Sequence, residues 1–504
     1  MADFAIEQTK AIVGGLITNL PSHIISRAGS PDAQNFDPSI EGGLSKRAGF
    51  VKFSTVNASA TGTYITGLFA GTQNNGTTNV FASEGTKLWK VSTSTSWTEC
   101  GNAAGSPLTL TSNEPVDMTI MDNVYIFCLV AGPFRWDGTT TAGAGPYPAL
   151  VDLGTDAPNQ AIVAGATLVE AHKNRTWVSG RSADPSKVYW SAMSDPTTWI
   201  ADATSPNAGH DAVFKDDGMT INGLKSNGDV LFVSKLSPGN TEGCIYGFFG
   251  DDPFSSVIRR VSHFGAVSQR AMLAFDGVMI VADTRGIHSL SAKGVALLSR
   301  DVQDLYEAIP NKHTIVATRY KNQIWFAYDS TGNSINDSVL VLDINRGRWS
   351  RYTGNGNISR AAVHPNGALL TGSMSGSQVI NSQMVGTNDD GAAIDFYWST
   401  PDLDWGSFYR DKAGKLLFVL TEDTGNFNIT MTRFLDGEEQ SDSVPYTFNV
   451  QVAGDITTST ARLVLPSSDR NSRFIRFKLR NNAANEPITI KAFAALAELE
   501  EETR

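Results

Sequence analysis

The strongest constraint on the fold is a short unit that recurs along the chain at nearly even intervals. Its clearest copy runs from Asn322 to Tyr352 and has an apolar run at 323–328, a turn rich in Gly, Asn, Ser and Asp, and a second apolar run at 338–342. Aromatic and β-branched residues favour strands, and the turn residues are those that close hairpins. A single hairpin cannot bury its apolar face, so the unit needs neighbours of the same kind.

Copies of this unit occupy the middle of the chain. They begin about 43 to 54 residues apart, close to the roughly 40 to 50 residues of a propeller blade. The even spacing favours a β-propeller of about six or seven blades, while a stack of unrelated hairpins in a sandwich remains the alternative. The copies lie at 79–91, 122–136, 174–190, 228–246, 276–290, 322–342 and 367–380.

The remaining sequence adds a second domain. The chain has 504 residues, too many for one compact core, and the even spacing ends near 387–391. Strand-like runs separated by acidic or Asn-rich turns follow, which predicts a propeller at 51–390 and a C-terminal antiparallel β-sandwich at 391–504. Helical patterns are confined to Val302–Ile309 and Ala492–Glu501. The predicted class is therefore all-β.

Residues 1–50 do not resemble a blade. Two Gly pairs and three prolines predict an extended N-terminal arm that cannot fold on itself. Its scattered apolar residues favour an arm that lies on a neighbouring subunit.

Composition excludes several classes of protein. A net charge of −11 argues against wrapping DNA, although not against DNA passing an acidic wall. Cys100, Cys128 and Cys244 show no Cys-x-x-Cys spacing, so buried thiols are expected rather than disulfides or zinc. No apolar run is long enough to span a bilayer. Asp3 and Glu7 stand where a signal peptide would carry a basic start, so the protein is expected to be made in a reducing cytoplasm.

The sequence lacks the motifs of common enzymes. There is no P-loop, no dinucleotide fingerprint, no His-Glu-x-x-His and no Gly-x-Ser-x-Gly. The pairs Asp216-Asp217, Asp251-Asp252 and Asp389-Asp390 could hold calcium or act as acid and base, but Asp is common in turns for backbone reasons. We therefore predict a protein that is not an enzyme, with no catalytic, metal-binding or cofactor-binding residue and no cofactor.

Three patches near the N-terminus resemble a known signature. Gly14-Gly15-Leu16, Gln34-Asn35 and Gly43-Leu44-Ser45-Lys46-Arg47-Ala48-Gly49 resemble, in this order, the N-terminal signature of tail-nozzle proteins of short-tailed bacteriophages. The segments 134–140 and 188–199 are similar to segments of phage tail propellers. The stretch from Arg476 to Ile490 is similar to the final strands of the same nozzles.

This resemblance implies a structural virion protein of the phage tail. Such nozzles are hexameric rings around the channel through which DNA is ejected, and they carry other tail proteins. The implied partners are further copies of the chain, a tail adaptor ring above, and tail fibres, tailspikes or a needle or plug. Six copies at −11 each would bring −66 to the ring, so DNA would slide through without sticking. The alternative is a monomeric propeller that binds or hydrolyses a host-surface glycan.

Three places in the chain are expected to contact partners, and the first two lie in the arm and in the middle of the chain. In the arm these are Leu44, Lys46 and Arg47. In the middle of the chain, Phe248 and Phe249 lie in a segment rich in Gly and Asp, where aromatic side chains either anchor into a partner or plug the turn onto their own blade.

The third expected contact is the strand at 473–480. Side chains alternate between the two faces of a strand, so Ile475, Phe477 and Leu479 should face the core. On the other face Arg476, Lys478 and Arg480 form a basic row in an acidic chain. This row is either a solvated edge strand guarded by its charges or a surface that meets an acidic patch on the next subunit or on the tail ring.

Overall fold

The computed structural model of this protein is dominated by β-strands, which make up 52% of it against 6% helix. This confirms the all-β class. The structure describes residues 3–38, 42–54, 64–91, 97–102, 104–139, 141–142, 147–201, 207–239, 242–291, 293–374, 379–440, 446–450, 458–465 and 472–500.

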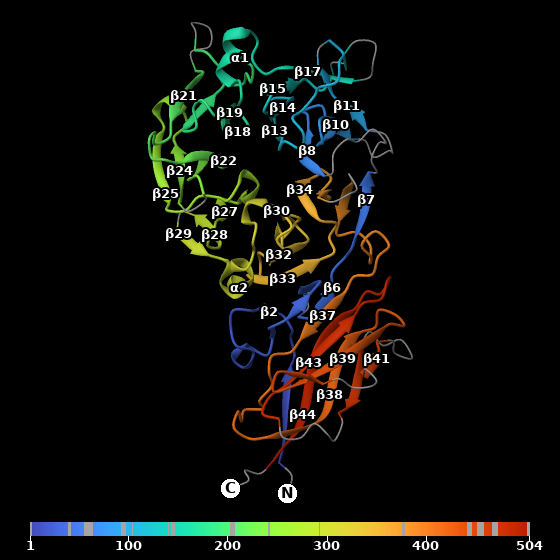
Figure 1. The fold of residues 1–504 in the computed structure, drawn as a ribbon. Helices are drawn as coiled ribbons and strands as arrows, with labels where there is room; N and C mark the ends of the chain where they lie inside the picture. The colour runs from blue at the N-terminus through green and yellow to red at the C-terminus, as the bar shows by residue number, and fades with distance from the viewer. Residues whose placement is uncertain are drawn as a thin grey trace.

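Over half of the chain forms a ring of seven mainly antiparallel sheets, counted in the described residues (Figure 1). Each inner strand contacts the inner strand of the next sheet, and the last contacts the first. The protein is therefore a β-propeller with seven blades, within the six or seven that the spacing of the repeats predicts. The inner strands are β8 (Ile65–Thr72), β13 (Asp117–Met121), β18 (Leu168–His172), β22 (Thr220–Asn227), β26 (Met272–Phe275), β30 (Val316–Tyr320) and β34 (Ile358–Val363).

The outer strands of each blade follow in chain order, so most of the ring is built from local hairpins. They are β9 (Thr78–Glu84), β10 (Lys87–Val91) and β11 (Thr98–Glu99); β14 (Val124–Leu129), β15 (Gly132–Trp136) and β17 (Tyr147–Asp152), with β12 (Gly101–Asn102) and β16 (Thr141–Ala142); β19 (Arg175–Ser179), β20 (Lys187–Trp190) and β21 (Gly209–Ala212); β23 (Val230–Leu236), β24 (Gly243–Phe249) and β25 (Val257–Ser262); β27 (Val278–Ala282), β28 (Ile287–Ser291) and β29 (Gly294–Leu297); β31 (Gln323–Tyr328), β32 (Ser338–Asp343) and β33 (Arg348–Thr353); and β35 (Leu369–Ser373) and β36 (Ile380–Gln383).

The seventh blade is completed from the other end of the repeat region. Its outermost strand is β7 (Phe50–Ser54), which pairs antiparallel with β36. Closure of the ring therefore joins the beginning of the propeller to its end, and neither end of the repeat region is left as a free edge.

Beside the ring, two sheets form the C-terminal sandwich. The first has the order β42-β38-β44-β6-β5, with β1 also paired to β44, and the second has the order β4-β37-β43-β39-β40, with β41 paired to β39. Five of these strands come from the N-terminal and junction segments. The strands are β1 (Asp3–Thr9), β4 (Ala33–Gln34), β5 (Phe36–Pro38), β6 (Leu44–Lys46), β37 (Phe396–Ser399), β38 (Lys412–Glu422), β39 (Asn428–Leu435), β40 (Glu438–Gln440), β41 (Tyr446–Asn449), β42 (Thr458–Val464), β43 (Ile475–Asn481) and β44 (Thr489–Leu499).

The N-terminal segment is extended, as expected, but it pairs with strands of its own chain and not with a neighbouring subunit. Strand β1 pairs along its whole length with β44, from Asp3 opposite Leu499 to Thr9 opposite Phe493. Strands β5 and β6 extend the same sheet, and β4 joins the other. The expectation that this arm lies on a neighbouring subunit is wrong for these residues, because its apolar side chains are needed to complete the chain's own sandwich.

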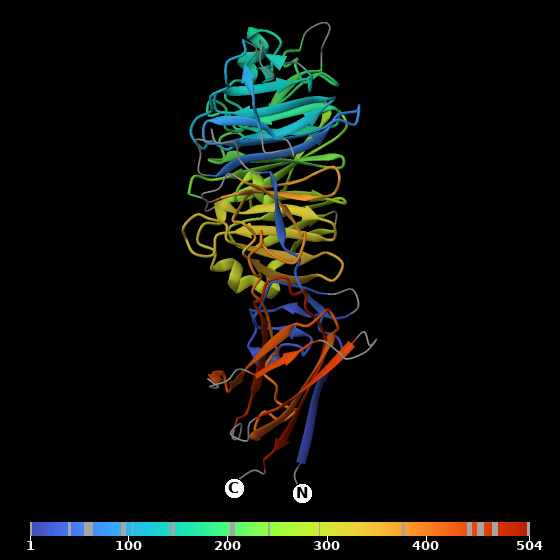
Figure 2. The ribbon, with the colours of Figure 1, turned by 90° about the vertical axis from the view of Figure 1, so that its right-hand side faces the viewer.

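The two parts lie end to end. Turning the molecule shows the ring edge-on, with the sandwich continuing from its rim beneath the fifth to seventh blades (Figure 2). The start of β1 and the end of β44 lie at the tip of the sandwich farthest from the ring.

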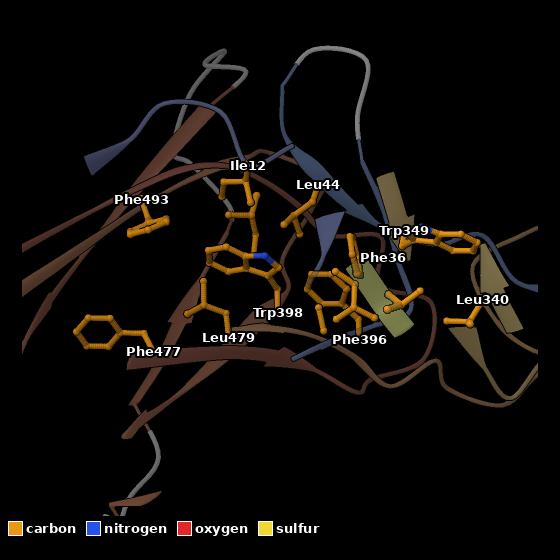
Figure 3. Close-up of a cluster of buried hydrophobic side chains, with 14 of the residues drawn as sticks. Ile12, Phe36, Leu44, Leu340, Trp349, Phe396, Trp398, Phe477, Leu479 and Phe493 are labelled. Atoms are coloured by element: carbon orange, nitrogen blue, oxygen red, sulfur yellow. The ribbon is translucent and has the colours of Figure 1, made fainter. Parts of the chain in front are cut away.

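One buried apolar cluster runs from the sandwich into the propeller (Figure 3). Trp398, Phe477 and Phe493 belong to the sandwich side, whereas Leu340 and Trp349 belong to the sixth blade. The Trp349 indole N–H donates to the carbonyl of Leu298 at 3.0 Å, so this large ring is both packed and hydrogen-bonded. The prediction that Trp349 is buried is confirmed.

The helices of the structure can be compared with the two helical patterns predicted from the sequence. The pattern at Val302–Ile309 is confirmed by α2 (Gln303–Glu307) and the 3-10 turn Ser299–Val302 before it. The helix predicted at Ala492–Glu501 is wrong, because residues 492–499 belong to β44, where pairing with β38 and β1 overrides the helix propensity of Ala, Leu and Glu. Glu501 lies outside the described residues. A short helix, α1 (Ala157–Val163), was not predicted.

Two expectations from composition can be compared with the structure. All three cysteines are free and buried, as predicted. In the described ranges, no helix is long and apolar enough to cross a membrane.

Candidate functional site: the joint between propeller and sandwich

The three N-terminal patches that carry the sequence resemblance meet where the sandwich joins the propeller. Asn35, which has a positive φ of 56°, is central to this joint. Its N–H donates to the carbonyl of Arg351 at 2.7 Å, and its Nδ2 donates to the carbonyl of Asp395 at 2.8 Å. Its amide oxygen accepts from the N–H of Thr353 and from Nε of Arg47, both at 2.8 Å. Asn35 therefore binds β33 of the propeller and the segment that enters the sandwich.

Arg47 completes the joint. Its side chain is 0% exposed, and its guanidinium binds both carboxylate oxygens of Asp389, at 2.8 and 2.5 Å. The same group donates to the carbonyls of Thr353 at 2.6 Å and Ala48 at 2.9 Å, and to the Asn35 amide. Bidentate pairing of this kind is both strong and directional. Burial raises the pKa of Asp389, and the Arg47 guanidinium opposes that rise.

The neighbouring residues of the same patch are also buried. Lys46 donates from Nζ to Oδ1 of Asn481 and to the carbonyl of Ala483, both at 2.9 Å. Burial lowers the pKa of Lys46 to about 8. Leu44 lies in the apolar cluster that crosses the joint. The prediction that Leu44, Lys46 and Arg47 contact a partner is therefore wrong, because their side chains are enclosed within the chain.

The glycines of the patches are required by close backbone approaches. Gly15 has a φ of +73°, and a Cβ there would lie 2.9 Å from the carbonyl oxygen of Trp349. A Cβ on Gly49 would lie 1.8 Å from the carbonyl oxygen of Asn388, closer than any real contact. Larger residues at either place would push the N-terminal segment off the propeller.

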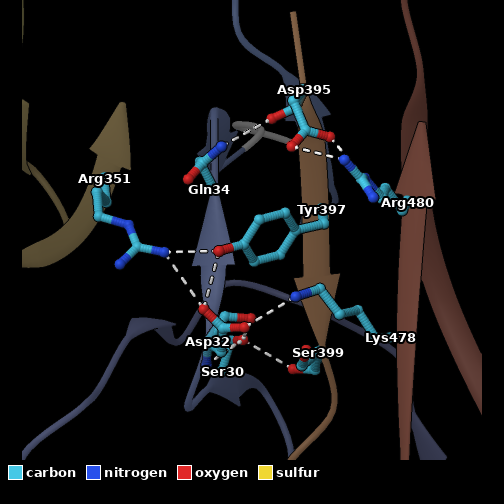
Figure 4. A network of polar contacts seen from close by, with 9 residues as sticks. All are labelled: Ser30, Asp32, Gln34, Arg351, Asp395, Tyr397, Ser399, Lys478 and Arg480. Atoms are coloured by element: carbon cyan, nitrogen blue, oxygen red, sulfur yellow. Dashed lines mark hydrogen bonds and ion pairs between the residues drawn. The ribbon is translucent and has the colours of Figure 1, made fainter. Parts of the chain in front are cut away.

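The basic row of β43 also belongs to the joint (Figure 4). Lys478 forms an ion pair with Asp32 at 3.0 Å, and its ammonium lies 3.6 Å from the centre of the Tyr397 ring. The Tyr397 hydroxyl donates to Asp32 at 3.1 Å and accepts from Arg351 at 2.7 Å. Arg351 itself reaches Asp32 at 3.3 Å. This network links β33 of the propeller, the N-terminal segment and two strands of the sandwich.

The other two cations of the row have carboxylate partners as well. Arg480 binds both oxygens of Asp395, at 2.7 and 3.1 Å, and this hydrogen bonding raises its pKa. Arg476 lies 3.7 Å from Asp402, and its guanidinium carbon lies 4.5 Å from the centre of the Phe434 ring. Each cation is thus paired inside the chain.

The interpretation of the basic row as an edge strand is wrong, and contact of the row with another subunit stays a prediction, with Arg480 the most exposed of its three cations at 50%. Strand β43 is not an edge strand, because it lies between β37 and β39. In this structure the carboxylates that the row meets, Asp32, Asp395 and Asp402, belong to the same chain. The prediction for the opposite face is confirmed, since Ile475, Phe477 and Leu479 are all buried in the core.

The aromatic pair near 248 lies in a blade. Phe248 is near the end of β24 and is buried, with its ring 5.5 Å from that of Trp177 in an edge-on contact. Phe249 is partly buried at the last position of the strand. Phe248 therefore packs between the third and fourth blades, so it is neither free to anchor in a partner nor part of a turn that plugs its own blade.

The acidic pairs have structural partners. Asp389 binds Arg47, as described. Asp217 binds the buried ammonium of Lys235 at 2.7 and 2.8 Å, and Asp251 pairs with Lys173 at 2.9 Å. Within the residues that the structure describes, no group of three or more His, Cys, Asp or Glu side chains could hold a metal ion. The geometry at these carboxylates fits anchoring of loops.

Sequence reasoning missed the acidic half of the joint. Asp32, Asp395 and Asp402 are single carboxylates in turn-like surroundings, and each meets a cation that is far away in the sequence. The sequence feature that could have predicted these partners was the basic row itself, because three cations on one strand of an acidic chain favour nearby carboxylates.

Comparisons with known proteins give no family. No protein-family model matches the chain, and no curated protein matches it. Among solved structures, it is similar to an extracellular domain assigned to a one-component system of B. thetaiotaomicron, with 10% identity and a TM-score of 0.45, over 89% of this chain and 63% of that one. The chain thus spans less than two thirds of the length of that domain.

Two further solved structures are also similar to the chain. The Neurospora crassa Pan2 WD40 domain has 8% identity and a TM-score of 0.40, over 67% of this chain and 97% of that one. An exo-β-1,3-galactanase from Phanerochaete chrysosporium has 10% identity and a TM-score of 0.28, over 88% of this chain and 99% of that one.

Proposed function

We propose that this chain is a structural protein of a virion tail, and that copies of it form a nozzle ring around the channel for DNA ejection. The observation that carries the proposal is that the nozzle-like patches are the residues that build the joint. Asn35 and Arg47 fix the propeller to the sandwich. This position supports the proposal, because the residues that carry the resemblance have a defined role in the architecture.

A fixed joint suits a ring component. In a ring every copy must present the same surfaces to its neighbours, and a rigid link between two domains provides this. The net charge of −11 per copy suits a wall past which DNA slides, since like charges oppose adhesion. The role needs no catalysis and no cofactor, and it places the protein in the virion tail after synthesis in the host cytoplasm.

Because the N-terminal arm is used within the chain, contacts between copies must use other surfaces. The tip of the sandwich offers one. Ile6 on β1 is 67% exposed and Phe408 is 68% exposed, and Phe4 and Tyr409 of the same two segments are exposed as well. The ion pair between Arg410 and Asp3 at 2.9 Å holds the two segments together. Exposed apolar side chains gathered in this way are typical of protein contacts.

The proposal is tested by the assembly state. Light scattering should show a ring of copies when the protein is mixed with the tail adaptor ring, and electron micrographs should show rings on the particle. Replacing Phe408 and Tyr409 by Ser should abolish the ring, whereas Val130→Ser, at an equally exposed propeller position, should leave it intact. A protein that stays a monomer beside its tail partners and binds host-surface glycan would contradict the proposal and favour the alternative.

A further inference from the structure

The centre of the propeller contains a cavity that the tail role does not use. It has a volume of about 400 Å³ and is lined by the inner strands of all seven blades, through side chains such as Leu68, Met118, Lys225, Met272 and Arg360. The volume is in the range of small-molecule sites.

A second hollow of about 360 Å³ adjoins the first. Its lining includes Tyr64 and His313. The two hollows share Pro115, Arg270 and Arg360, so both arginines stand where the hollows meet. Arg270 comes from the turn before β26, and Arg360 comes from β34.

In the part of the chain that the structure describes, neither arginine has a carboxylate partner. The hydrogen bonds of their guanidinium groups go to main-chain carbonyls, from Arg270 to His313 at 3.4 Å and from Arg360 to Ser359 at 2.9 Å. Among the described residues, neither arginine has an ion pair within 4.0 Å. The sequence segments 55–63 and 375–378, which adjoin the described lining residues Tyr64 and Met374, contain no Asp or Glu.

The local field is therefore positive. Burial lowers the pKa of both Arg270 and Arg360, and the charge of Arg270 lowers that of Arg360 further. The carboxylate that acts on Arg360 is Asp117, a single negative charge that lines the same cavity and also accepts from the N–H of Val169 at 2.9 Å. Two guanidinium groups that repel each other in a confined space are stabilised by an anion between them.

We propose that the axial cavity binds a small molecule through an anionic group, a carboxylate, phosphate or sulfate, held between Arg270 and Arg360. The planar donors of arginine suit such groups because they bind two oxygens at once. The body of the ligand would lie against Leu68, Met118 and Met272, and its hydroxyl groups would face the polar lining. This site lies within a single subunit and does not depend on a ring. A negative result for the site would therefore leave the proposed tail role untouched, and the reverse also holds.

The test is titration calorimetry of the full chain with D-glucuronate, inorganic phosphate and the neutral sugar D-glucose. We expect heat of binding with at least one anion and none with glucose, and at least tenfold weaker binding after Arg270→Gln and Arg360→Gln are combined. Binding of glucuronate but not phosphate would identify a carboxylate ligand, and the reverse a phosphate ligand. Arg319→Gln is the matched control, because Arg319 lies on an inner strand and has its own partner in Asp276 at 3.7 Å.

Three results would overturn the proposal. One is equal binding of glucose and glucuronate. Another is anion binding that the double substitution leaves unchanged in a protein whose circular dichroism spectrum is native. The third is the absence of binding for both anions at low salt. Should the double variant fail to fold, the comparison of glucuronate with glucose in the unchanged protein, at 20 mM and at 500 mM salt, decides the question, because an arginine-held anion must weaken with salt.

Discussion

The propeller and the sandwich are both built of antiparallel strands, but they are assembled in opposite ways. In the propeller, six of the seven blades are formed by strands that follow one another in the chain. In the sandwich, β1 from one end of the chain pairs with β44 from the other, and β4 to β6 enter both sheets. The propeller is thus local in sequence, whereas the sandwich exists only when the two ends of the chain meet.

This difference predicts different consequences of damage. A blade that loses one strand keeps its neighbours on both sides, because its core is shared around the ring. The sandwich depends on the N-terminal segment for strands in both sheets and for Arg47, its buried link to Asp389. The N-terminal residues should therefore matter more to the sandwich than to most of the propeller.

The largest effect is expected from removal of residues 1–49. This deletion takes away β1 and β4 to β6, so the remaining sandwich strands lose partners for their backbone groups and cover for their apolar core. We expect limited proteolysis to degrade residues after 391 rapidly, while large propeller fragments persist. A truncated protein that resists protease as the full chain does would show that the segment is dispensable for the sandwich.

The next largest effect concerns the two tryptophans Trp349 and Trp177. Each is buried, and replacing either by Ala should cost about 3 to 5 kcal/mol of unfolding free energy. Trp349 belongs to the cluster that crosses the joint, whereas Trp177 belongs to a cluster within the propeller. Thermal unfolding of Trp349→Ala should therefore lower the stability of both domains, and Trp177→Ala that of the propeller alone. Equal effects on the sandwich would contradict a shared core.

A similar loss of unfolding free energy is expected when the buried ion pair between Arg47 and Asp389 is broken. Arg47→Met leaves Asp389 buried without its cation, which typically costs about 3 to 5 kcal/mol. The control lies nearby in the sequence, since Lys52 pairs with Asp390 at 2.9 Å but is 45% exposed. Lys52→Met should change the unfolding free energy by only about 0 to 1 kcal/mol. Denaturant titrations of both variants measure the contrast, and similar losses would show that burial does not decide the strength of the pair.

The same contrast explains what could be foreseen from the sequence. The blades were predictable because the 322–352 hairpin carries its pattern within about thirty residues and the pattern recurs. The apolar alternation of Ile475, Phe477 and Leu479 was equally local. The role of the N-terminal segment was not predictable, because Gly pairs and prolines describe an extended chain but not its partner. The apparent helix at Ala492–Glu501 failed for the same reason, since pairing with β1 and β38 overrode local preference.

The joint shows most clearly which contacts cannot be predicted from the sequence. Lys46 and Arg47 were predicted to contact another protein, but their partners Asn481 and Asp389 lie far along the same chain. Charge in a turn-rich segment normally indicates a solvated surface. Only the fold brings these groups together and removes them from water.

A smaller effect is expected inside the propeller at Asp117, whose pKa burial raises from 3.8 to about 6. Between about pH 4 and 6 the folded protein keeps a proton that the unfolded chain releases, so stability due to this group falls as the pH rises through that window. Asp117→Asn lacks this titration. The variant should match the unchanged protein near pH 4 and be more stable by about 1 to 3 kcal/mol above pH 6. A difference that does not vary with pH would exclude the raised pKa.

The central claim is that the two ends of one chain complete one sandwich, and a single cross-link tests it most directly. Gln8 on β1 lies opposite Ala494 on β44, and neighbouring strands bring such Cα atoms within the reach of a disulfide. The natural cysteines are buried and should not compete.

The measurement is a non-reducing gel of the Gln8→Cys, Ala494→Cys protein after mild oxidation, with Gln8→Cys alone as the control. The account predicts a monomer of altered mobility that reverts on reduction, and no such species in the control. Covalent ladders of two or more chains, with no cross-linked monomer, would contradict the account, because they would place the N-terminal strand on a neighbouring subunit.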